Sequence, residues 1–378
     1  MTSLAISASH KLRPGLTPAI LGIGTANPPA VPQELALELA MELGCFDNEQ
    51  RSWIKRLFLR SGIETRCSVL ATGDEDQLLS PRRFYPAAKS PQDRGPTTAQ
   101  RMARYAVEAP ILAEKAARSA LENAQIEPER ITHLVTASCT GFFSPGLDAA
   151  LIERLNLSRS MRRIHLGFMG CHAAFNALAA ARDAAAADPD ARVLVCCVEL
   201  CSLHFAYGVD PGKLVANALF ADGAASAVVG RTASDGDGPW QLSDFSSCLL
   251  AECGDAMTWN IGDHGFEMTL SAGVPEIIRR QLLPWCSTWL ARHELELPDI
   301  AGWAIHPGGP KILTAIADAL TLGPQDLRFS RHVLAHYGNM SSATVLFILR
   351  QMAGKISGPC VAIGLGPGLM AEGMLFNK

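Results

Sequence analysis

Three residues whose side chains could together carry out nucleophilic acyl transfer stand at matching points of this 378-residue chain: Cys171, His306 and Asn339. Cys171 follows Gly170 just before the helical stretch FNALAAARDAAAA, and the partial positive charge of a helix N-terminus favours a thiolate there. His306 ends the apolar run IAGWAIH, so it should project from the carboxyl end of a strand. A buried structural cysteine and an N-capping asparagine are the alternative roles for Cys171 and Asn339.

The three side chains form a chemically sensible set. A protonated histidine beside the sulfur stabilises its thiolate and makes it a better nucleophile. Imidazole and carboxamide N–H groups together can hold a carbonyl oxygen as negative charge develops on it. His172 is the nearest rival for the role of His306, but a residue next to the nucleophile on a helix points away from it.

The same order of elements occurs twice along the chain, which links the three residues. ITHLVTASCTG matches IAGWAIHPGGP, GFMGCHAAFNAL matches HYGNMSSATVLFIL, and ARVLVCCVELC matches GPCVAIGLGPG. Cys171 follows Ile131 by 40 residues and Asn339 follows Ile300 by 39, so both lie at equivalent strand-to-helix junctions. The repeat therefore predicts that the two helix starts meet, with His306 at the matching strand end.

Apolar runs that read as strands alternate with helical stretches, a pattern typical of an α/β fold with βαβ units on a mostly parallel sheet. The clearest predicted strands are 131–138, 192–199, 225–230, 300–306 and 359–366. A Pro-rich loop over 82–97 leads into a predicted Ala-rich helix from Thr98 to Ala124. The composition break at 232–240 divides the chain into a half at 1–235 with the cysteine and a half at 236–378 with the histidine and asparagine.

Composition excludes several function classes. The chain is 48% hydrophobic and 19% charged, which indicates a large packed core. A net charge of −4, without basic clusters among aromatics, argues against nucleic-acid and anionic-membrane binding. No apolar run is long enough for a membrane span or a leader, so we expect a cytoplasmic protein. The eleven cysteines lack zinc-ligand spacing and the glycine loops lack the dinucleotide fingerprint, so we expect no metal and no nucleotide cofactor.

Five motifs together resemble the type III polyketide synthases, whose best-known members are the chalcone and stilbene synthases. They are GC at 170–171, ALFADGAASAVVG at 218–230, AIHPGGPKIL at 304–313, YGNMSSATVLFIL at 337–349 and GLGPGL at 364–369. The similarity extends over most of the chain and is nearer to bacterial members, through SCTGF at 138–142 and HGFEM at 264–268.

The resemblance implies a thiolase-like fold of two pseudo-duplicated halves in α/β/α/β/α layers, a homodimer and no bound cofactor. A starter acyl-CoA would load onto Cys171, and His306 and Asn339 would assist decarboxylation of malonyl-CoA. Repeated extension and cyclisation would follow. A fatty-acid synthase or a carrier protein is the alternative donor of the starter.

The resemblance also predicts substrate-binding residues. Phe220 matches a phenylalanine that gates the cavity beside the cysteine, while Met268 replaces the second gating phenylalanine of plant enzymes. Trp259 replaces a small residue and could close one wall, and Arg51 is the one counterpart of three CoA-binding basic residues. Small residues match a tunnel that accepts fatty acyl starters in bacterial relatives: Cys139, Thr140, Ser144 and Cys201.

These matches favour a fatty acyl starter and an alkylresorcinol or alkylpyrone product. A type III enzyme with a small starter is one alternative. Another is a ketoacyl-carrier-protein synthase of the same fold, which makes a single condensation, although HPGGP and GNMSS count against it. A non-catalytic relative that kept only the fold is a third, and the intact trio opposes it.

Overall fold

The computed structural model describes residues 16–71, 84–232, 240–250 and 254–377. The strands are β1 Thr17–Ala26, β2 Ala30–Pro32, β3 Thr65–Cys67, β4 His133–Ser138, β5 Arg162–Gly167, β6 Arg192–Leu200, β7 Asp222–Thr232, β8 Trp240–Leu249, β9 Met257–Gly262, β10 Gly265–Leu270, β11 Gly302–Ile305, β12 Pro359–Gly366 and β13 Met370–Asn377. The α-helices are α1 Gln33–Leu43, α2 Asn48–Leu59, α4 Thr98–Ala124, α5 Leu147–Leu155, α6 Ala173–Ala187, α7 Pro211–Leu219, α8 Val274–Ala291, α9 Pro310–Leu320, α10 Arg328–Tyr337 and α11 Thr344–Met352.

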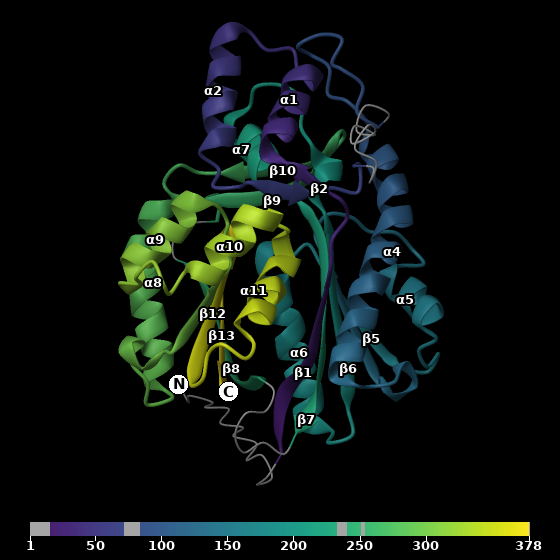
Figure 1. The fold of residues 1–378 in the computed structure, drawn as a ribbon, viewed down its shortest axis with the longest axis vertical. Coiled ribbons are helices and arrows are strands. Elements are labelled where there is room, and N and C mark those ends of the chain that lie inside the picture. The colour runs from purple at the N-terminus through teal and green to yellow at the C-terminus, as the bar shows by residue number, and fades with distance from the viewer. Residues whose placement is uncertain (1–15, 72–83, 233–239, 251–253, 378) are drawn as a thin grey trace, which may run out of the picture.

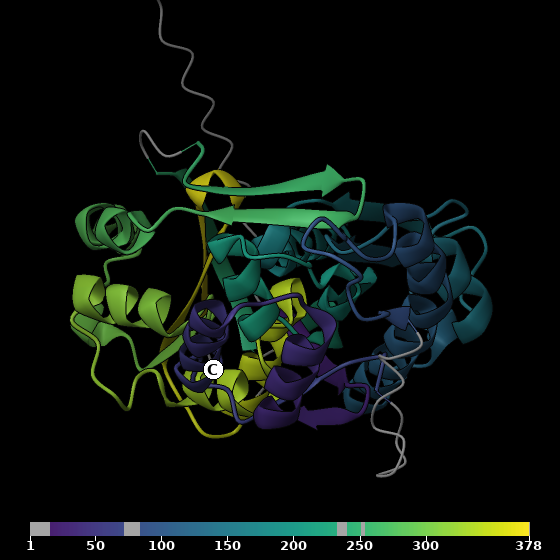
Figure 2. The ribbon, with the colours of Figure 1, turned by 90° about the horizontal axis from the view of Figure 1, so that it is seen from above.

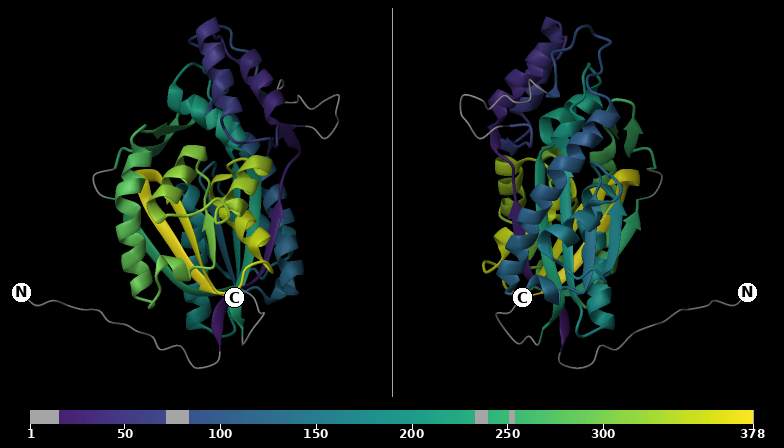
Figure 3. Two further views of the ribbon diagram at one scale, coloured as in Figure 1. Left: turned by 60° about the vertical axis from the view of Figure 1, so that its left-hand side comes forward. Right: turned by 90° about the vertical axis from the view of Figure 1, so that its right-hand side faces the viewer.

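A nine-stranded sheet runs through the molecule in the order β11-β12-β13-β8-β1-β7-β6-β4-β5. Its two halves meet where β1 pairs with β8, at Ala19–Gln241 and Ile20–Trp240. From this meeting the halves diverge, and α6 and α11 lie between them (Figures 1 and 3). Helices α4 and α5 cover the outer face of one half and α8 and α9 that of the other. The predicted α/β/α/β/α layering is therefore confirmed.

The strand β6 shows why these apolar runs fold as central strands. Its odd-numbered residues from 193 to 197 pack against the α6–α11 layer, and its even-numbered residues from 194 to 198 pack under α4 and α5. Successive side chains of a strand point to opposite faces, so a strand covered on both faces has no polar alternation. Five predicted strands are present, with ends shifted by at most a few residues.

The prediction of a mostly parallel sheet is wrong. Only the pairs β4–β5, β4–β6 and β11–β12 are parallel, while β7, β1, β8 and β13 pair antiparallel with their neighbours. The antiparallel strands form the centre of the sheet, where the two halves join. Their double-sided burial makes them as uniformly apolar as parallel strands, so the sequence pattern does not reveal their direction.

Helix α4 has the bounds that the sequence predicts. Thr97 begins it with a capping box that includes Gln100. It packs along β1, where Gly22 and Gly24 lack the Cβ atoms that would overlap the α4 backbone. The predicted division between the halves, at 235–236, lies outside the described residues.

The upper end of the molecule in Figure 1 carries the elements that are not duplicated. Seen from above, the hairpin β9–β10 and the helix pair α1–α2 lie on opposite sides, and α7 contacts both (Figure 2). No helix among the residues that the structure describes has an apolar stretch long enough to cross a membrane.

A glycine at position 170 is required by both backbone angle and space. Gly170 has φ +79°, and a Cβ there would overlap Pro367. We expect Gly170→Ala to lower the free energy of unfolding by about 3 kcal/mol or more, since left-handed strain and overpacking add. Gly354 is the matched control, with φ +74° and open space around it, so Gly354→Ala should cost only about 1–2 kcal/mol. Urea unfolding measures both, and equal losses would contradict the role of Pro367.

Candidate active site

Cys171 stands where the chain leaves β5 and enters α6. A 3₁₀ turn over Gly170–His172 joins directly to Ala173, the first residue of α6. The left-handed conformation of Gly170 makes the sharp turn that places the sulfur at the wall of a cavity. The sequence prediction that this cysteine stands at a helix start is confirmed.

Asn339 occupies the corresponding junction of the second half. Gly338 precedes it with φ +74°, and a 3₁₀ turn over Ser341–Ala343 leads into α11. The Asn339 N–H donates to the Leu219 carbonyl at 2.9 Å, and its side-chain oxygen accepts from the Ser341 N–H at 2.9 Å. The Ser341 hydroxyl in turn donates to the Cys171 sulfur at 3.5 Å. The two helix starts therefore meet, as the internal repeat predicts.

His306 follows β11, at the same end of the sheet. Its N–H donates to the Ile363 carbonyl of β12 at 2.8 Å, and the carboxyl end of β12 contacts Gly170 and His172 through Gly366 and Pro367. The ring is 2% exposed, and neither nitrogen has a hydrogen-bond partner among the described residues. An unpaired buried polar group lowers the free energy of unfolding by about 1–3 kcal/mol. Such groups are rare in proteins and often have a functional role.

Burial sets the electrostatics of the site. It raises the pKa of the Cys171 thiol to about 12, against the opposite effect of hydrogen bonds from Ser341 and Asn339. Burial, together with the nearby His172, lowers the pKa of His306 to about 3. A lone thiolate and a lone imidazolium are therefore both disfavoured. Proton transfer from sulfur to a neighbouring imidazole creates the two charges as a pair, whose attraction in a low dielectric offsets the cost of burying each.

His172, the rival histidine, is held by α6. It is 2% exposed, its Nδ1 hydrogen-bonds the Asn176 side-chain oxygen at 3.1 Å, and its ring packs against Gly366. Like the ring of His306, it does not line the cavity, but unlike that ring it has a hydrogen-bond partner on its own helix. This placement agrees with the expectation that the residue after the nucleophile points elsewhere.

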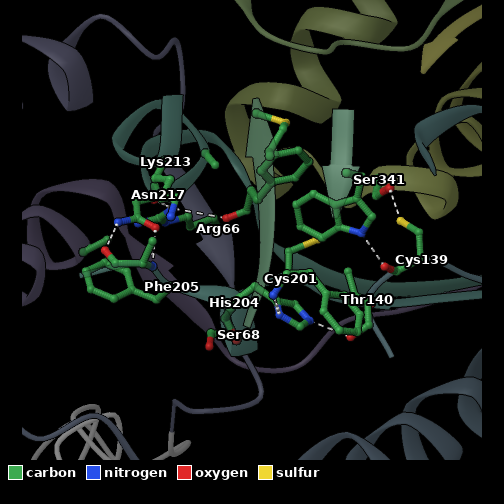
Figure 4. Close-up of a pocket in the computed structure, with 18 of the residues that line it drawn as sticks. Arg66, Ser68, Cys139, Thr140, Cys201, His204, Phe205, Lys213, Asn217 and Ser341 are labelled. Carbon is green, nitrogen blue, oxygen red and sulfur yellow. Dashed lines mark hydrogen bonds between the residues drawn. The ribbon is translucent and has the colours of Figure 1, made fainter. Parts of the chain in front are cut away.

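A mainly apolar cavity of about 1240 Å³, including the part open to solvent, begins at Cys171. Figure 4 shows Ser341, Cys139 and Thr140 at one end and Arg66, Asn217 and Lys213 at the other. Six of the predicted substrate-binding residues line it: Cys139, Thr140, Cys201, Phe220, Trp259 and Met268. His306 and Asn339 are buried behind the wall, and the backbone of Asn339 pairs with that of Phe220.

The hairpin β9–β10 closes one side of the cavity with an aromatic cluster. The Trp259 indole N–H donates to the Cys139 carbonyl at 2.7 Å, and its ring meets Phe266 edge-on. Phe266 stacks on His204 with ring centroids 4.2 Å apart. The expectation that Trp259 closes a wall agrees with this placement, but the sequence analysis missed His204 and Phe266.

The sequence analysis also missed Glu199, a carboxyl that is completely buried in β6. It accepts hydrogen bonds from the Cys139 N–H at 3.1 Å, the Thr140 hydroxyl at 2.7 Å and the Ser342 hydroxyl. Burial raises its pKa, while these bonds lower it. Glu199 thus ties the segment after β4 to the start of α11. The signal was available, because a glutamate inside the apolar run VLVCCVEL is unusual.

Two predicted residues do not lie at the cavity. Ser144 is exposed and borders a separate depression with Tyr105 and Gly141, because the chain turns outward after Thr140 to begin α5. The structure thus places Ser144 and Thr140 in different depressions, and the role of Ser144 in substrate binding stays a prediction. Arg51 lies on α2 and donates to the carbonyls of Phe46 and Met41, and it does not reach the cavity wall.

A doubled α/β body, with a cysteine at one central helix start and an asparagine at the other, defines a cysteine-dependent acyl-condensing enzyme of the thiolase-like fold. Comparison with known families identifies the particular group. Residues 8–233 match the N-terminal domain of chalcone and stilbene synthases, and residues 241–378 match their C-terminal domain. The chain belongs to this family, the type III polyketide synthases, which are acyltransferases that carry out Claisen-type condensations.

Individual relatives support the assignment. The chain is 34% identical over 375 residues to the alpha-pyrone synthesis polyketide synthase-like Pks18 of Mycobacterium tuberculosis, covering 96% of this chain and 92% of that protein. It is 32% identical to the 1,3,6,8-tetrahydroxynaphthalene synthase of Streptomyces peucetius subsp. caesius, covering 95% and 93%. The crystal structure of PKS-I from the brown alga Ectocarpus siliculosus superimposes with a TM-score of 0.89 at 30% identity, covering 97% of this chain and 99% of that one.

His306 is expected to be the base that activates Cys171. In His306→Ala the buried thiol keeps its raised pKa without a proton acceptor, so alkylation of Cys171 by iodoacetamide at pH 7 should slow by about 100-fold. Because the thiolate fraction grows below the pKa, the variant's rate should rise about tenfold per pH unit into the alkaline range. Peptide mass spectrometry measures the rate. His172→Gln is the control and should keep the wild-type rate. The assignment fails if His172→Gln slows alkylation while His306→Ala does not.

Proposed function

We propose that this enzyme condenses malonyl-CoA repeatedly onto a fatty acyl starter held on Cys171 and cyclises the product to an alkylpyrone or alkylresorcinol. The cavity supports this proposal, because it leads from the small residues Cys139, Thr140 and Cys201 to aliphatic side chains of α1. An alkyl chain gains about 0.8 kcal/mol for each methylene buried against such a surface. A relative named for alpha-pyrone synthesis is consistent with this chemistry.

Loading begins when the Cys171 sulfur attacks the carbonyl carbon of the acyl-CoA thioester. The thiol proton passes to His306, whose ring is neutral because burial lowers its pKa. The bond between the carbonyl carbon and the CoA sulfur breaks, and CoA leaves with the proton from His306. The acyl group then stays on Cys171 as a thioester, and both residues are uncharged again.

The decarboxylation of malonyl-CoA drives each extension. Loss of CO₂ leaves the bonding electron pair on the remaining two-carbon unit as an enolate. The His306 ring and the Asn339 carboxamide would donate hydrogen bonds to the enolate oxygen, a role that suits the unpaired nitrogens of His306. The enolate carbon attacks the acyl carbonyl and releases the Cys171 sulfur. No electrons are gained or lost overall, so the reaction needs no redox cofactor.

Product analysis with radiolabelled malonyl-CoA tests this function. Wild-type enzyme is expected to release cyclic products with several two-carbon units from long-chain acyl-CoA. Cys171→Ala should lose both the product and the acyl adduct seen by intact-mass analysis. A single two-carbon addition would instead indicate a ketoacyl synthase, and turnover of short starters alone would indicate a small-starter enzyme. Parallel reactions with acyl-carrier protein identify the donor.

We further propose that the enzyme is a homodimer joined at β5. This strand ends the sheet and pairs only with β4 among the described strands. Ile164 on β5 is 50% exposed, and the nearby Phe142 and Met169 are also exposed. An open strand edge beside apolar side chains is a ready template for pairing, and two-fold symmetry would satisfy both copies at once.

Replacing Ile164 by Asp is expected to separate the dimer, because it places unpaired charges at the centre of the interface. Light scattering coupled to gel filtration should then give the mass of one chain instead of two. Leu59→Asp is the matched control, since Leu59 is 61% exposed on α2 and far from β5. A wild-type mass of one chain, or an Ile164→Asp mass of two, would refute the β5 interface.

A further inference from the structure

Building on the proposed function, we infer that Arg101 is a positioning residue for chain extension, although its side chain does not line the cavity. Arg101 stands in the first turn of α4 and is completely buried. It holds two walls of the cavity against each other: the turn after β6, over 201–205, and the hairpin β9–β10. A fixed separation of these walls keeps the growing chain oriented for the next condensation and shielded from water.

Arg101 is a buried cation without a counter-ion among the residues that the structure describes. Burial lowers its pKa, and no described carboxylate forms an ion pair with it. Its Nη2 also lacks a hydrogen-bond partner there, while its Nε donates to the Pro96 carbonyl at 2.9 Å. A well-packed apolar side chain of similar volume is often at least as stable at such a place. Folding stability alone therefore does not account for an arginine here.

The remaining hydrogen bonds of Arg101 fix the turn after β6. Its Nη1 donates to the carbonyls of Leu203 and Phe205 at 2.7 and 3.0 Å. The same nitrogen donates to the Tyr85 hydroxyl at 3.0 Å, and the guanidinium lies over the Tyr85 ring. His204 stands between the two bonded carbonyls and lines the cavity, as do Tyr85 and Phe205. One guanidinium thus holds this entire wall.

The hairpin β9–β10 is fixed at the same place. Gly265 in its turn has φ +112°, and a Cβ there would lie 3.1 Å from the guanidinium of Arg101. The Thr98 hydroxyl accepts from the Gly265 N–H at 2.8 Å and donates to the Gly262 carbonyl. The Thr98 N–H donates to the Asp263 carbonyl at 2.8 Å. The first turn of α4 therefore carries the hairpin beside Arg101.

His204 links the two walls inside the cavity. The Phe266 N–H of the hairpin donates to its Nδ1 at 2.9 Å, which leaves the ring proton on Nε2. This Nε2–H donates to the Thr140 carbonyl at 2.6 Å, and the neighbouring Cys139 carbonyl accepts from Trp259 of the hairpin. Displacing the turn after β6 would therefore disturb the hairpin and the segment beside Cys171 together.

Hydrogen exchange of the hairpin tests the coupling of the walls. Arg101→Ala removes the guanidinium, and Thr98→Val removes the hydroxyl under the hairpin turn while keeping the shape of the side chain. Amide exchange in peptide 257–270 should become about tenfold faster in both variants, because lost hydrogen bonds make local opening easier. Thr98→Ser keeps the hydroxyl and should exchange like wild type.

Product analysis tests whether this coupling serves chain extension. With labelled malonyl-CoA, the ratio of full-length to shorter products should fall about tenfold in Arg101→Ala and Thr98→Val, because misplaced walls slow the next condensation. The shorter products arise when water adds to the thioester carbonyl and the Cys171 thiol leaves with a proton. Acylation of Cys171 itself should stay within about twofold of wild type, since the reacting groups are unchanged.

Chemical rescue separates positioning from general damage. Millimolar guanidinium should raise the product ratio of Arg101→Ala, because its planar fork can reach several carbonyls at once. Ammonium at the same concentration should not, since it is a compact point charge. Arg118→Ala is the matched control variant: Arg118 lies on the same helix, is 48% exposed and pairs with Glu114, so its loss should leave the product ratio unchanged.

The outcomes separate this inference from the proposed function. Faster hairpin exchange with a wild-type product ratio would show that Arg101 is structural only. Unchanged exchange in both variants would refute the coupling of the walls. If Arg101→Ala does not fold, the comparison of Thr98→Val with Thr98→Ser decides between these results. If wild type forms no extended product from any starter, the proposed function fails, and the exchange data still decide whether the walls are coupled.

Discussion

The meeting of two helix starts at the centre of the molecule is the constraint on which the rest of the structure depends. Gly170 and Gly338 both have positive φ angles, and each lies at the turn that leads into a helix of the middle layer. The Ser341 hydroxyl then reaches the Cys171 sulfur. Helices α6 and α11 must be apolar on nearly all sides because both halves of the sheet enclose them, which explains their alanine-rich and aliphatic sequences.

This enclosure also determines the chemistry. A dry site raises the cost of any lone charge, so the thiol of Cys171 and the ring of His306 are stable in their neutral forms. The surrounding polar groups are tied into bonds, most completely around Glu199, whereas the ring nitrogens of His306 are left without partners. The unpaired nitrogens of His306 thus lower the folding stability, and a bound carbonyl or a transferred proton can supply the missing hydrogen bonds.

The predicted catalytic residues and the cavity walls come from different parts of the fold. Cys171, His306 and Asn339 lie on the duplicated elements, whereas α1 and the hairpin β9–β10 have no counterpart in the repeat. Side chains such as Ala40 and Trp259 can therefore change without disturbing the two helix starts. A division of this kind lets one chemistry serve many substrates, because the scaffold holds the reacting groups and the added elements shape the cavity.

The sequence alone determined the core of this picture. Repeated motifs placed Cys171 and Asn339 at equivalent junctions. A Pro-rich loop followed by an Ala-rich stretch located α4, and apolar runs located the central strands. These features are local, so neighbouring residues are enough to specify them. Strand direction was misread, because strands buried on both faces look alike whether parallel or antiparallel.

Only the tertiary structure decided what surrounds each side chain. Glu199 finds its partners on segments 60 and 143 residues away, and no local pattern encodes such a meeting. Ser144 was placed in the cavity by its offset from Cys171, but the chain turns outward before reaching it. The apolar stripe of α1, formed by Ala36, Leu39, Ala40 and Leu43, would give the same sequence pattern whether it packed against other side chains or lined a cavity. Whether such a stripe packs or lines a cavity depends on distant elements, and those are brought together only by folding.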